Sequence, residues 1–199
     1  IIDEVQTGLG RTGRMWAIDE WGVVPDILVA GKGLSGAVYP MSATCHRPHL
    51  EAFFRDNPFI HLSSFGGAAL GCVAALTMLD QITEPGFMEH VRAMADRFAV
   101  GFESLKAGYA PGFEIRQRGL FIGLDLEDDM HGPLMTMLLA QNGVLAVFAN
   151  HRPSTVQILP PLTIEPDEVD YCLDALAHSL QALRSGQAAV DLPLAQIVG

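Results

Sequence analysis

The chain contains two lysines among its 199 residues, and their surroundings differ. Lys106 stands at the end of a polar helical pattern, where a charged amine is solvated. Lys32 follows the apolar run of residues 27–30, which is typical of a short buried strand. A glycine on each side of Lys32 lets the backbone turn and another group approach closely. Such an amine is either a strand-end lysine that reaches solvent or a nucleophile that forms an imine with a carbonyl compound. We favour the second interpretation.

Two other glycine-dependent sites do not fit the spacing around Lys32. A phosphate-binding P-loop requires a glycine where Asp26 stands, and Ser or Thr where Gly33 stands. A nucleophile elbow around Ser35 requires a glycine at the position of Ala37. Of the sites considered around Lys32, the one that remains is a lysine that forms an imine with a carbonyl compound.

Asp3 is a second candidate, since it also ends an apolar run, 29 residues before Lys32. Open α/β sheets bind their ligands at the carboxyl ends of their strands. Pyridoxal phosphate needs this pair of groups, because a lysine carries its aldehyde and a carboxylate keeps its pyridine nitrogen protonated. We expect Asp3 and Lys32 both to be buried, with their opposite charges offsetting the cost of burial.

The composition argues against several classes of partner. A net charge of −11 disfavours nucleic acid and anionic membranes, and 49% hydrophobic with 18% charged residues indicates a globular chain. No apolar run approaches the roughly 18 residues of a membrane span, and we expect no secretory leader, since no basic start followed by an apolar core is present in the sequence. Cys45, Cys72 and Cys172 are odd in number and far apart, which favours reduced thiols and a cytoplasmic location. His46 and His49 have no further ligand cluster, so no metal site is expected.

Turn residues at 84–86 predict a domain boundary. In the first domain, 1–84, we expect strands at 27–30, 39–44 and 59–65, short helices at 15–21 and 49–55, and a long apolar helix from 67 to about 82, buried on most sides. In the second domain, 85–184, we expect helices at 87–106, 132–142 and 167–184 and strands at 113–118, 120–126, 144–149 and 155–159. Residues 185–199 are expected to form a weakly ordered tail. The sequence begins as though inside a strand, from which we expect a fragment of a longer polypeptide rather than a processed start.

Four motifs together resemble one enzyme family. They are D-E-V-Q-T-G-L-G-R-T-G at 3–13, P-D-I-L-V-A-G-K-G-L-S-G at 25–36, H-L-S-S-F-G-G at 61–67 and L-P-P-L-T-I at 159–164. This combination resembles the class III pyridoxal-phosphate aminotransferases, among them the ornithine, acetylornithine, 4-aminobutyrate and diamine enzymes. The resemblance covers about residues 1–184. It implies an α/β protein of aminotransferase fold type I, with the carboxyl half of the large cofactor domain followed by a small α/β domain.

The resemblance also implies roles for five residues. Lys32 would be the Schiff-base lysine and proton shuttle, and Asp3 would hold the pyridine nitrogen. Gln6 would bind the phenolic oxygen of pyridoxal 5'-phosphate, and Val5 would pack on the ring. Ser64 stands where the family has a threonine whose hydroxyl reaches the cofactor phosphate of the neighbouring subunit, which implies a homodimer with shared active sites.

Three departures from the family pattern concern the helix start and the substrate. Ala68 and Ala69 replace Asn-Pro, which removes the usual capping chemistry, and Ala37 replaces a common glycine. Gln157 replaces an arginine that binds the substrate carboxylate in many members, so charge-assisted binding is lost there. Together with the diamine-like segment 56–61, this favours a primary amine, diamine or ω-amino donor. Arg152, five residues upstream, offers a replacement charge and keeps an ordinary amino acid donor open.

We therefore expect transfer of an amino group from such a donor to a 2-keto acid by ping-pong chemistry. The cation for the keto acid is expected from residues upstream of this chain, together with the main phosphate loop, so the chain should be inactive alone. Two alternatives stay open. One is another reaction on the same fold, such as an aminomutase, racemase or decarboxylase. The other is an inactive fragment that only dimerises.

Overall fold

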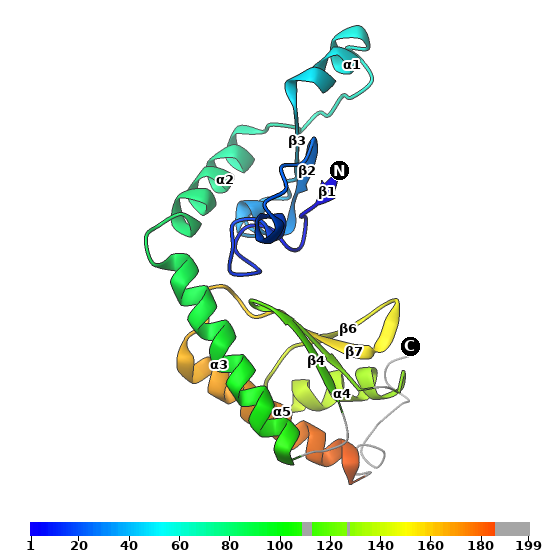
Figure 1. Ribbon diagram of the computed structural model, residues 1–199. Coiled ribbons are helices and arrows are strands. Elements are labelled where there is room, and N and C mark those ends of the chain that lie inside the picture. Colours follow the sequence, from blue (N-terminus) through cyan, green and yellow to red (C-terminus); the bar gives the residue numbers. More distant parts are fainter. Residues whose placement is uncertain (109–112, 127, 186–199) are drawn as a thin grey trace. The chain divides into compact units, whose positions relative to one another are not determined.

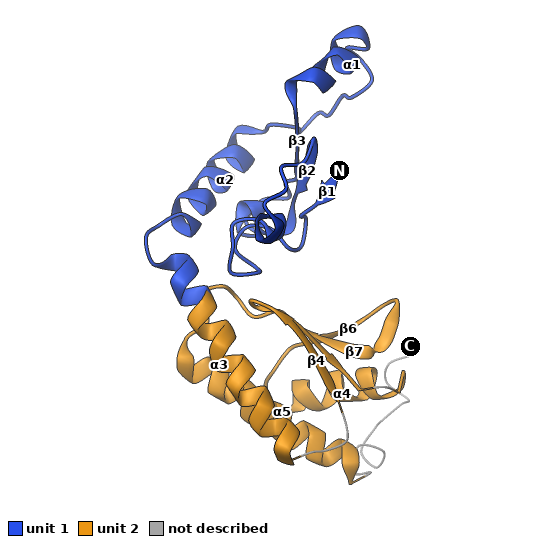
Figure 2. Cartoon of the chain, viewed as in Figure 1, with its two compact units in different colours: residues 1–91 blue, residues 92–199 orange. Residues whose placement is uncertain are grey.

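The computed structural model describes residues 1–108, 113–126 and 128–185. It divides the chain into two compact units, Ile1–Val91 and Arg92–Gly199, which are coloured separately in Figure 2. The division falls within helix α3 (Phe87–Gly108), just after the turn at residues 84–86. The tail expected at 185–199 lies outside the described residues except for Ser185.

Unit 1 is built on a small three-stranded sheet in the order β1-β2-β3 (Figure 1). Strand β1 (Ile2–Asp3) runs parallel to β2 (Ile27–Ala30), and β3 (Ala43–His46) runs antiparallel to β2. The connections carry the short 3₁₀ helices η1 (Ala17–Trp21), η2 (Lys32–Ser35) and η3 (Pro48–Leu50) and the short helix α1 (Glu51–Asp56). Helix α2 (Ala69–Ile82) closes the unit over a cluster that includes Leu9, Leu34 and Ala75.

Three expectations for unit 1 were wrong. The strand expected at 39–44 lies at Ala43–His46, because Pro40 has no N–H to donate to the sheet. Residues 59–65 form bends rather than a strand. Helix α2 is not buried on most sides, since Leu70 is 75% and Val73 62% exposed. Within unit 1 only one side of α2 has a neighbour to pack on.

Unit 2 holds an antiparallel four-stranded sheet in the order β4-β5-β7-β6. The strands are β4 (Glu114–Arg118), β5 (Phe121–Asp125), β6 (Val147–Ala149) and β7 (Arg152–Ile158), and the helices are α3, α4 (His131–Gln141) and α5 (Pro166–Arg184). Helix α4 packs against β7 and α5 against α4. All four expected strands are present, although the expected strand at 144–149 is confined to Val147–Ala149 and the one at 155–159 begins earlier.

The unit 2 sheet has one apolar and one polar face, as period-2 alternation requires. Leu124 and Val156 are paired in register and fully buried, so their face lies toward the core. The neighbouring row, Arg116, Gly123 and Gln157, belongs to the opposite face. Within the described part of the chain, no helix is long and apolar enough to cross a membrane.

Candidate functional site

Lys32 lies where the sequence predicted, directly beyond the carboxyl end of β2, and it opens helix η2. Its backbone is in the left-handed region, with φ +37°, which is unfavourable for a residue with a Cβ. Backbone strain of this kind persists where the surrounding structure fixes it, often at functional sites. The fold therefore holds this lysine in an uncommon conformation.

Gln6 lies beside the lysine. Lys32 Nζ donates a hydrogen bond to Gln6 Oε1 at 2.5 Å, although the two residues are 26 positions apart in sequence. The sequence assigned both to one site, and the structure brings them together. The contact places an amide group, which can both donate and accept, next to a primary amine.

Val5 lies beside Gly31, the residue that directly precedes Lys32. A Cβ at Gly31 would lie 3.2 Å from Val5 Cγ1, so the valine packs directly on the glycine that precedes the lysine. A residue with a Cβ at position 31 would therefore be tightly packed against Val5. Val5 lies on the backbone that directly precedes Lys32.

Asp3 ends β1 and is paired in parallel register with Val29 of β2. Its Oδ1 accepts a hydrogen bond from the Val5 backbone N–H at 2.9 Å. Since adjacent strands are about 4.8 Å apart, Asp3 and Lys32 extend from neighbouring strand ends. The expected burial of both groups was wrong, because both residues are exposed and no ion pair joins them among the described contacts. Solvated charges carry little desolvation cost, so neither needs the other as a counter-ion.

Glu4 is a residue that the sequence analysis missed. Its side chain is buried, only 1% of the residue being exposed, and it accepts hydrogen bonds from the backbone N–H groups of Ala17 at 3.1 Å and Ile18 at 2.9 Å and from the Thr7 hydroxyl. These bonds close the glycine-rich loop that carries Gln6. Alternation along β1 was the one available signal, because a residue next to outward-facing Asp3 must face inward.

Ser64 is exposed in the connection between α1 and α2. No described contact joins it to Lys32, Gln6 or Asp3. The structure therefore does not bring Ser64 into the group formed by the other unit 1 candidates.

Gln157 and Arg152 both belong to β7 in unit 2. Gln157 is half-buried on the polar face and lies opposite Gly123 on β5 and Val147 on β6. Arg152 Nη2 lies 2.7 Å from Asp125 Oδ2, so its charge is directed to that carboxylate. Asp125 is almost completely buried and also accepts a hydrogen bond from the Ser154 hydroxyl at 2.9 Å. Asp125 could not be identified from the sequence, because nothing in the pattern separates it from an ordinary strand-end acid.

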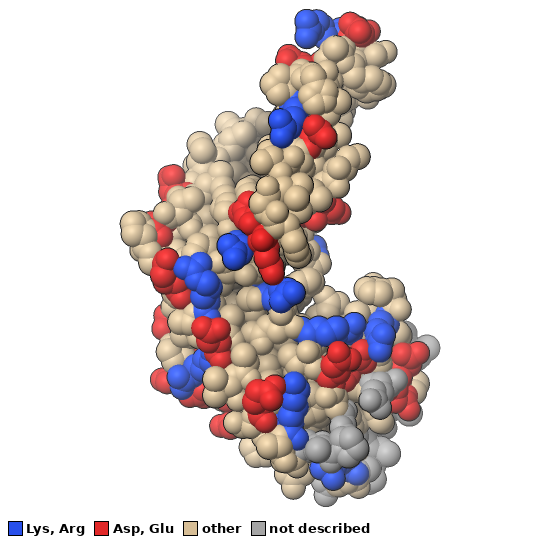
Figure 3. Space-filling model, viewed as in Figure 1, with Lys and Arg blue, Asp and Glu red and all other residues tan. Residues whose placement is uncertain are grey.

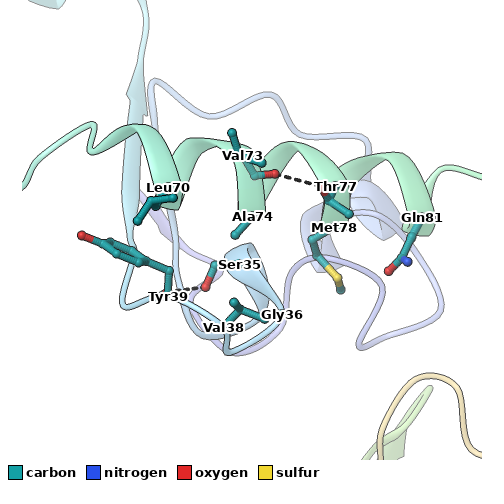
Figure 4. A pocket seen from close by; sticks show the side chains of 10 residues that line it. All are labelled: Ser35, Gly36, Val38, Tyr39, Leu70, Val73, Ala74, Thr77, Met78 and Gln81. Atoms are coloured by element: carbon teal, nitrogen blue, oxygen red, sulfur yellow. Dashed lines mark hydrogen bonds between the residues drawn. The ribbon is translucent and has the colours of Figure 1, made fainter.

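A groove of about 570 Å³ lies between α2 and the turn after η2 (Figure 4). Apolar side chains dominate its walls, and none of the candidate residues lines it. The residues that line it are Ser35, Gly36, Val38, Tyr39, Leu70, Val73, Ala74, Thr77, Met78 and Gln81. The groove is thus separate from the contact between Lys32 and Gln6. Within the described residues, no group of three or more His, Cys, Asp or Glu side chains is arranged to hold a metal ion.

Comparison with known proteins gives a consistent result for sequence and for structure. The family model for class III aminotransferases matches residues 1–180. An uncharacterised aminotransferase of Archaeoglobus fulgidus is 48% identical over 91% of this chain and 43% of its own length. The acetylornithine aminotransferase of Caldanaerobacter subterraneus is 36% identical over 92% of this chain and 45% of its own length.

Solved structures agree with these matches. The ornithine aminotransferase of Toxoplasma gondii superposes with a TM-score of 0.83 at 32% identity, covering 92% of this chain and 43% of that one. The expected fold class, α/β of aminotransferase fold type I, is confirmed by this similarity. The chain spans less than half the length of these relatives.

Proposed function

Because the chain belongs to the class III aminotransferase family, we propose that the full-length protein transfers an amino group from a donor amine to a 2-keto acid, with pyridoxal phosphate as its cofactor. The observation that carries this proposal is the contact between Lys32 Nζ and Gln6 at the carboxyl end of β2. We further propose that donor and acceptor bind and leave in turn, in a ping-pong sequence.

The unit 1 residues fit pyridoxal phosphate in their chemistry. Once bound, the cofactor supplies an electron-accepting ring that eases removal of a proton from the donor carbon. Lys32 Nζ would hold the aldehyde and, when released, would take and return that proton. Asp3 would keep the ring nitrogen protonated, Gln6 would bind the phenolic oxygen through its amide, and Val5 would pack on the ring face.

The role of Asp3 is tested by exchanging its charge for a neutral amide of the same shape. In full-length protein, Asp3→Asn removes the charge that favours the protonated ring nitrogen. We expect cofactor to remain partly bound while proton removal, followed in the half-reaction with donor alone, slows by at least about tenfold. A near-normal rate in Asp3→Asn would assign the carboxylate a structural role only.

We propose that the active form is a homodimer in which Ser64 binds the cofactor phosphate of the neighbouring subunit. The support is the exposed apolar segment around Ser64, where Phe59 and Phe65 are 81% and 80% exposed, since such patches favour protein contacts. Sedimentation of the full-length enzyme at assay concentration tests this proposal. A monomer with full activity would contradict it.

For the donor, we propose a primary amine, diamine or ω-amino compound, because Gln157 offers a neutral amide where an arginine would bind a carboxylate. The names of the relatives, acetylornithine and ornithine aminotransferase, support an ω-amino group as the reacting end. Half-reactions with putrescine, cadaverine, ornithine and acetylornithine, followed by loss of the absorbance of lysine-bound cofactor, test the choice. A strong preference for the two carboxylated compounds would rule out a simple amine.

A second candidate is another pyridoxal-phosphate reaction on the same fold, since a fold does not fix the reaction. A mutase, racemase or decarboxylase needs no amino acceptor. Product formation that is independent of added pyruvate or 2-oxoglutarate would favour this candidate over transamination. We also propose a cytoplasmic location, on the basis of three widely spaced free cysteines.

A further inference from the structure

Glu4 is one of two buried carboxylates among the described residues, and Asp125 is the other. Figure 3 shows acidic side chains at the surface of both units on the face that it draws, where charged groups ordinarily lie. The Asp125 carboxylate pairs with two guanidinium groups, since Nη2 of Arg116 and of Arg152 lie 3.0 and 2.7 Å from its Oδ2. Glu4 is bonded to neutral donors instead. Burying a carboxylate in this way costs free energy, so its position needs a reason other than charge pairing.

The carboxylate of Glu4 joins the two ends of the loop that follows β1. Its Oε1 accepts the Ile18 N–H at 2.9 Å, and its Oε2 accepts the Ala17 N–H at 3.1 Å and the Thr7 hydroxyl at 2.5 Å. Ala17 and Ile18 open the helix η1, and the first N–H groups of a helix have no carbonyl of their own helix to bond. Both carboxylate oxygens therefore act as acceptors, and they tie the start of the loop to the helix that ends it.

The backbone of Glu4 holds the same segment against the sheet. Its N–H donates to the Val29 carbonyl of β2 at 2.8 Å, and its carbonyl accepts the Gly8 N–H at 3.0 Å. The turn is closely packed at Gly8, where a Cβ would lie 2.7 Å from the Trp16 ring and 2.9 Å from the Glu4 carbonyl oxygen. The short segment 4–8 is therefore fixed at both of its ends by bonds of Glu4.

Gln6 lies within this segment, between Glu4 and the two residues that Glu4 bonds, Thr7 and Gly8. The Gln6 side chain meets Lys32, whose Nζ donates to Gln6 Oε1. An ammonium group can only donate, so the amide oxygen faces Nζ, and the amide NH₂ is the end that is left to donate to another group. The direction of this NH₂ depends on the backbone at position 6, which the bonds of Glu4 hold in place.

We infer that Glu4 is a positioning residue for the cofactor, which it serves by fixing Gln6 beside the Lys32 amine and toward the phenolic oxygen. This inference rests on the proposed function, in which Gln6 binds that oxygen. An apolar residue at position 4 would avoid the cost of burying a charge. It would also leave the N–H groups of Ala17 and Ile18 without this acceptor and the loop without its closure. The carboxylate thus sets the place of the loop rather than balancing a charge.

The test titrates full-length protein, stripped of its cofactor, with pyridoxal phosphate and follows the absorbance of lysine-bound cofactor. In Glu4→Gln one carboxylate oxygen becomes an NH₂ group, which cannot accept, so at least one of the Ala17 and Ile18 N–H groups loses its acceptor. We expect the Kd for pyridoxal phosphate to rise about tenfold, as for loss of a hydrogen bond to a charged group. The absorbance maximum should shift in the same direction as in Gln6→Ala, because both variants disturb the same amide.

A double-mutant cycle separates positioning of Gln6 from general support of the fold. Glu4→Gln should raise the Kd about tenfold in the wild-type background but less than about twofold in a Gln6→Ala background, because residues that act through one another are not additive. Gly132→Ala is the control for stability. It disturbs backbone packing within unit 2, and it should change neither the Kd for pyridoxal phosphate nor the absorbance maximum.

Thr7→Val is the second variant, and it decides the question if Glu4→Gln does not fold. It removes the hydroxyl next to Gln6 and leaves both backbone bonds of the Glu4 carboxylate in place. The Kd for pyridoxal phosphate should therefore rise by a smaller factor, about threefold.

Three outcomes would overturn the inference. They are an unchanged Kd in a folded Glu4→Gln protein, an equal effect of Glu4→Gln with and without the Gln6 side chain, and, where Glu4→Gln does not fold, an unchanged Kd in Thr7→Val. Failure of the proposed function looks different, because it would appear in the wild-type protein, which would then transfer no amino group to any keto acid whatever its Kd for the cofactor.

Discussion

The two units differ in how completely they bury their apolar residues. In unit 2 a sheet and its helices enclose a core that includes Phe98, Phe102 and Leu139, each no more than 1% exposed. In unit 1 the buried cluster is small, and apolar residues of α1, α2 and the connection between them remain in solvent. Yet unit 1 holds Lys32, whose backbone is in the left-handed region. The residues proposed to bind the cofactor thus lie in the unit that packs less by itself, whereas unit 2 contributes a four-stranded sheet.

The largest expected effect is the loss of turnover when the unit 1 lysine, Lys32, is replaced, compared with replacement of the unit 2 lysine, Lys106. In full-length protein, Lys32→Ala should lower transamination by at least about a thousandfold, because no other lysine of this chain lies beside Gln6. Lys106→Ala is the matched control in unit 2, where Lys106 pairs with Glu103 at 2.9 Å on an exposed helix surface. Its turnover should stay near wild type. Substantial turnover in Lys32→Ala would mean that the reacting amine lies elsewhere.

The alkylation rate of the Cys172 thiol should show how well the unit 2 core excludes solvent. Burial raises the pKa of Cys172 to about 11. Compared with a free thiol of pKa about 8.5, its thiolate fraction at pH 8 falls by at least about a hundredfold, and alkylation should slow accordingly. Peptide mass spectrometry of native and urea-unfolded full-length protein measures this protection. Equal labelling in both states would show that the unit 2 core opens freely.

The same thiol gives unit 2 a pH dependence with a definite sign. The folded pKa is raised, so the contribution of the neutral thiol is complete below about pH 8.5, where the unfolded thiol ionises. It is lost progressively as pH rises toward about 11. A Cys172→Ala protein should lose less stability over this range than wild type, as measured by urea unfolding.

A smaller effect is expected from a close backbone contact in unit 2. A Cβ at Gly132 would lie 1.7 Å from the Pro153 carbonyl oxygen, which is backbone and cannot rotate away. Gly132→Ala should therefore destabilise the protein by about 1–3 kcal/mol in urea unfolding. Gly108→Ala is the control, because nothing lies within 4 Å of its Cβ position. An unchanged midpoint in Gly132→Ala would contradict the tight packing of α4 against the start of β7.

The smallest effect concerns the start of α2 in unit 1. Ala68 is the N-cap of this helix, with φ −54° and ψ 132°, and no side chain caps it. Ala68→Asn should stabilise full-length protein by about 1 kcal/mol, because the amide oxygen can accept a free N–H of the first turn. Ala68→Val should give no gain. Equal stability of the two variants would mean that neighbouring residues already satisfy this helix end.

Local patterns predicted much of the fold. Apolar periodicity located α2, α3 and α5, and the run before Lys32 located β2, because each of these signals is carried by neighbouring residues. Exposure could not be predicted in this way. The apolar sequence of α2 indicates a buried helix, but burial depends on what covers Leu70 and Val73, and unit 1 covers one side only.

The candidate site was predictable where residue type identifies the chemistry. Lys32 and Asp3 could be named from residue type and position, and Gln6 was implied by the resemblance to the family. The structure adds the hydrogen bond between Lys32 and Gln6. Glu4 and Asp125 could not be named from sequence, because their importance lies in the backbone groups and the neighbouring strand that their carboxylates reach. Register and loop closure are tertiary properties that no local pattern encodes.

The proposed function depends most directly on Lys32 Nζ carrying pyridoxal phosphate in the full-length protein. Reduction with borohydride fixes the bond between that nitrogen and the cofactor, and tandem mass spectrometry of a digest then locates the modified lysine. We expect one pyridoxyl group per subunit, on the peptide that contains Lys32. A modified lysine at any other position, or no modification in protein supplied with cofactor, would contradict it.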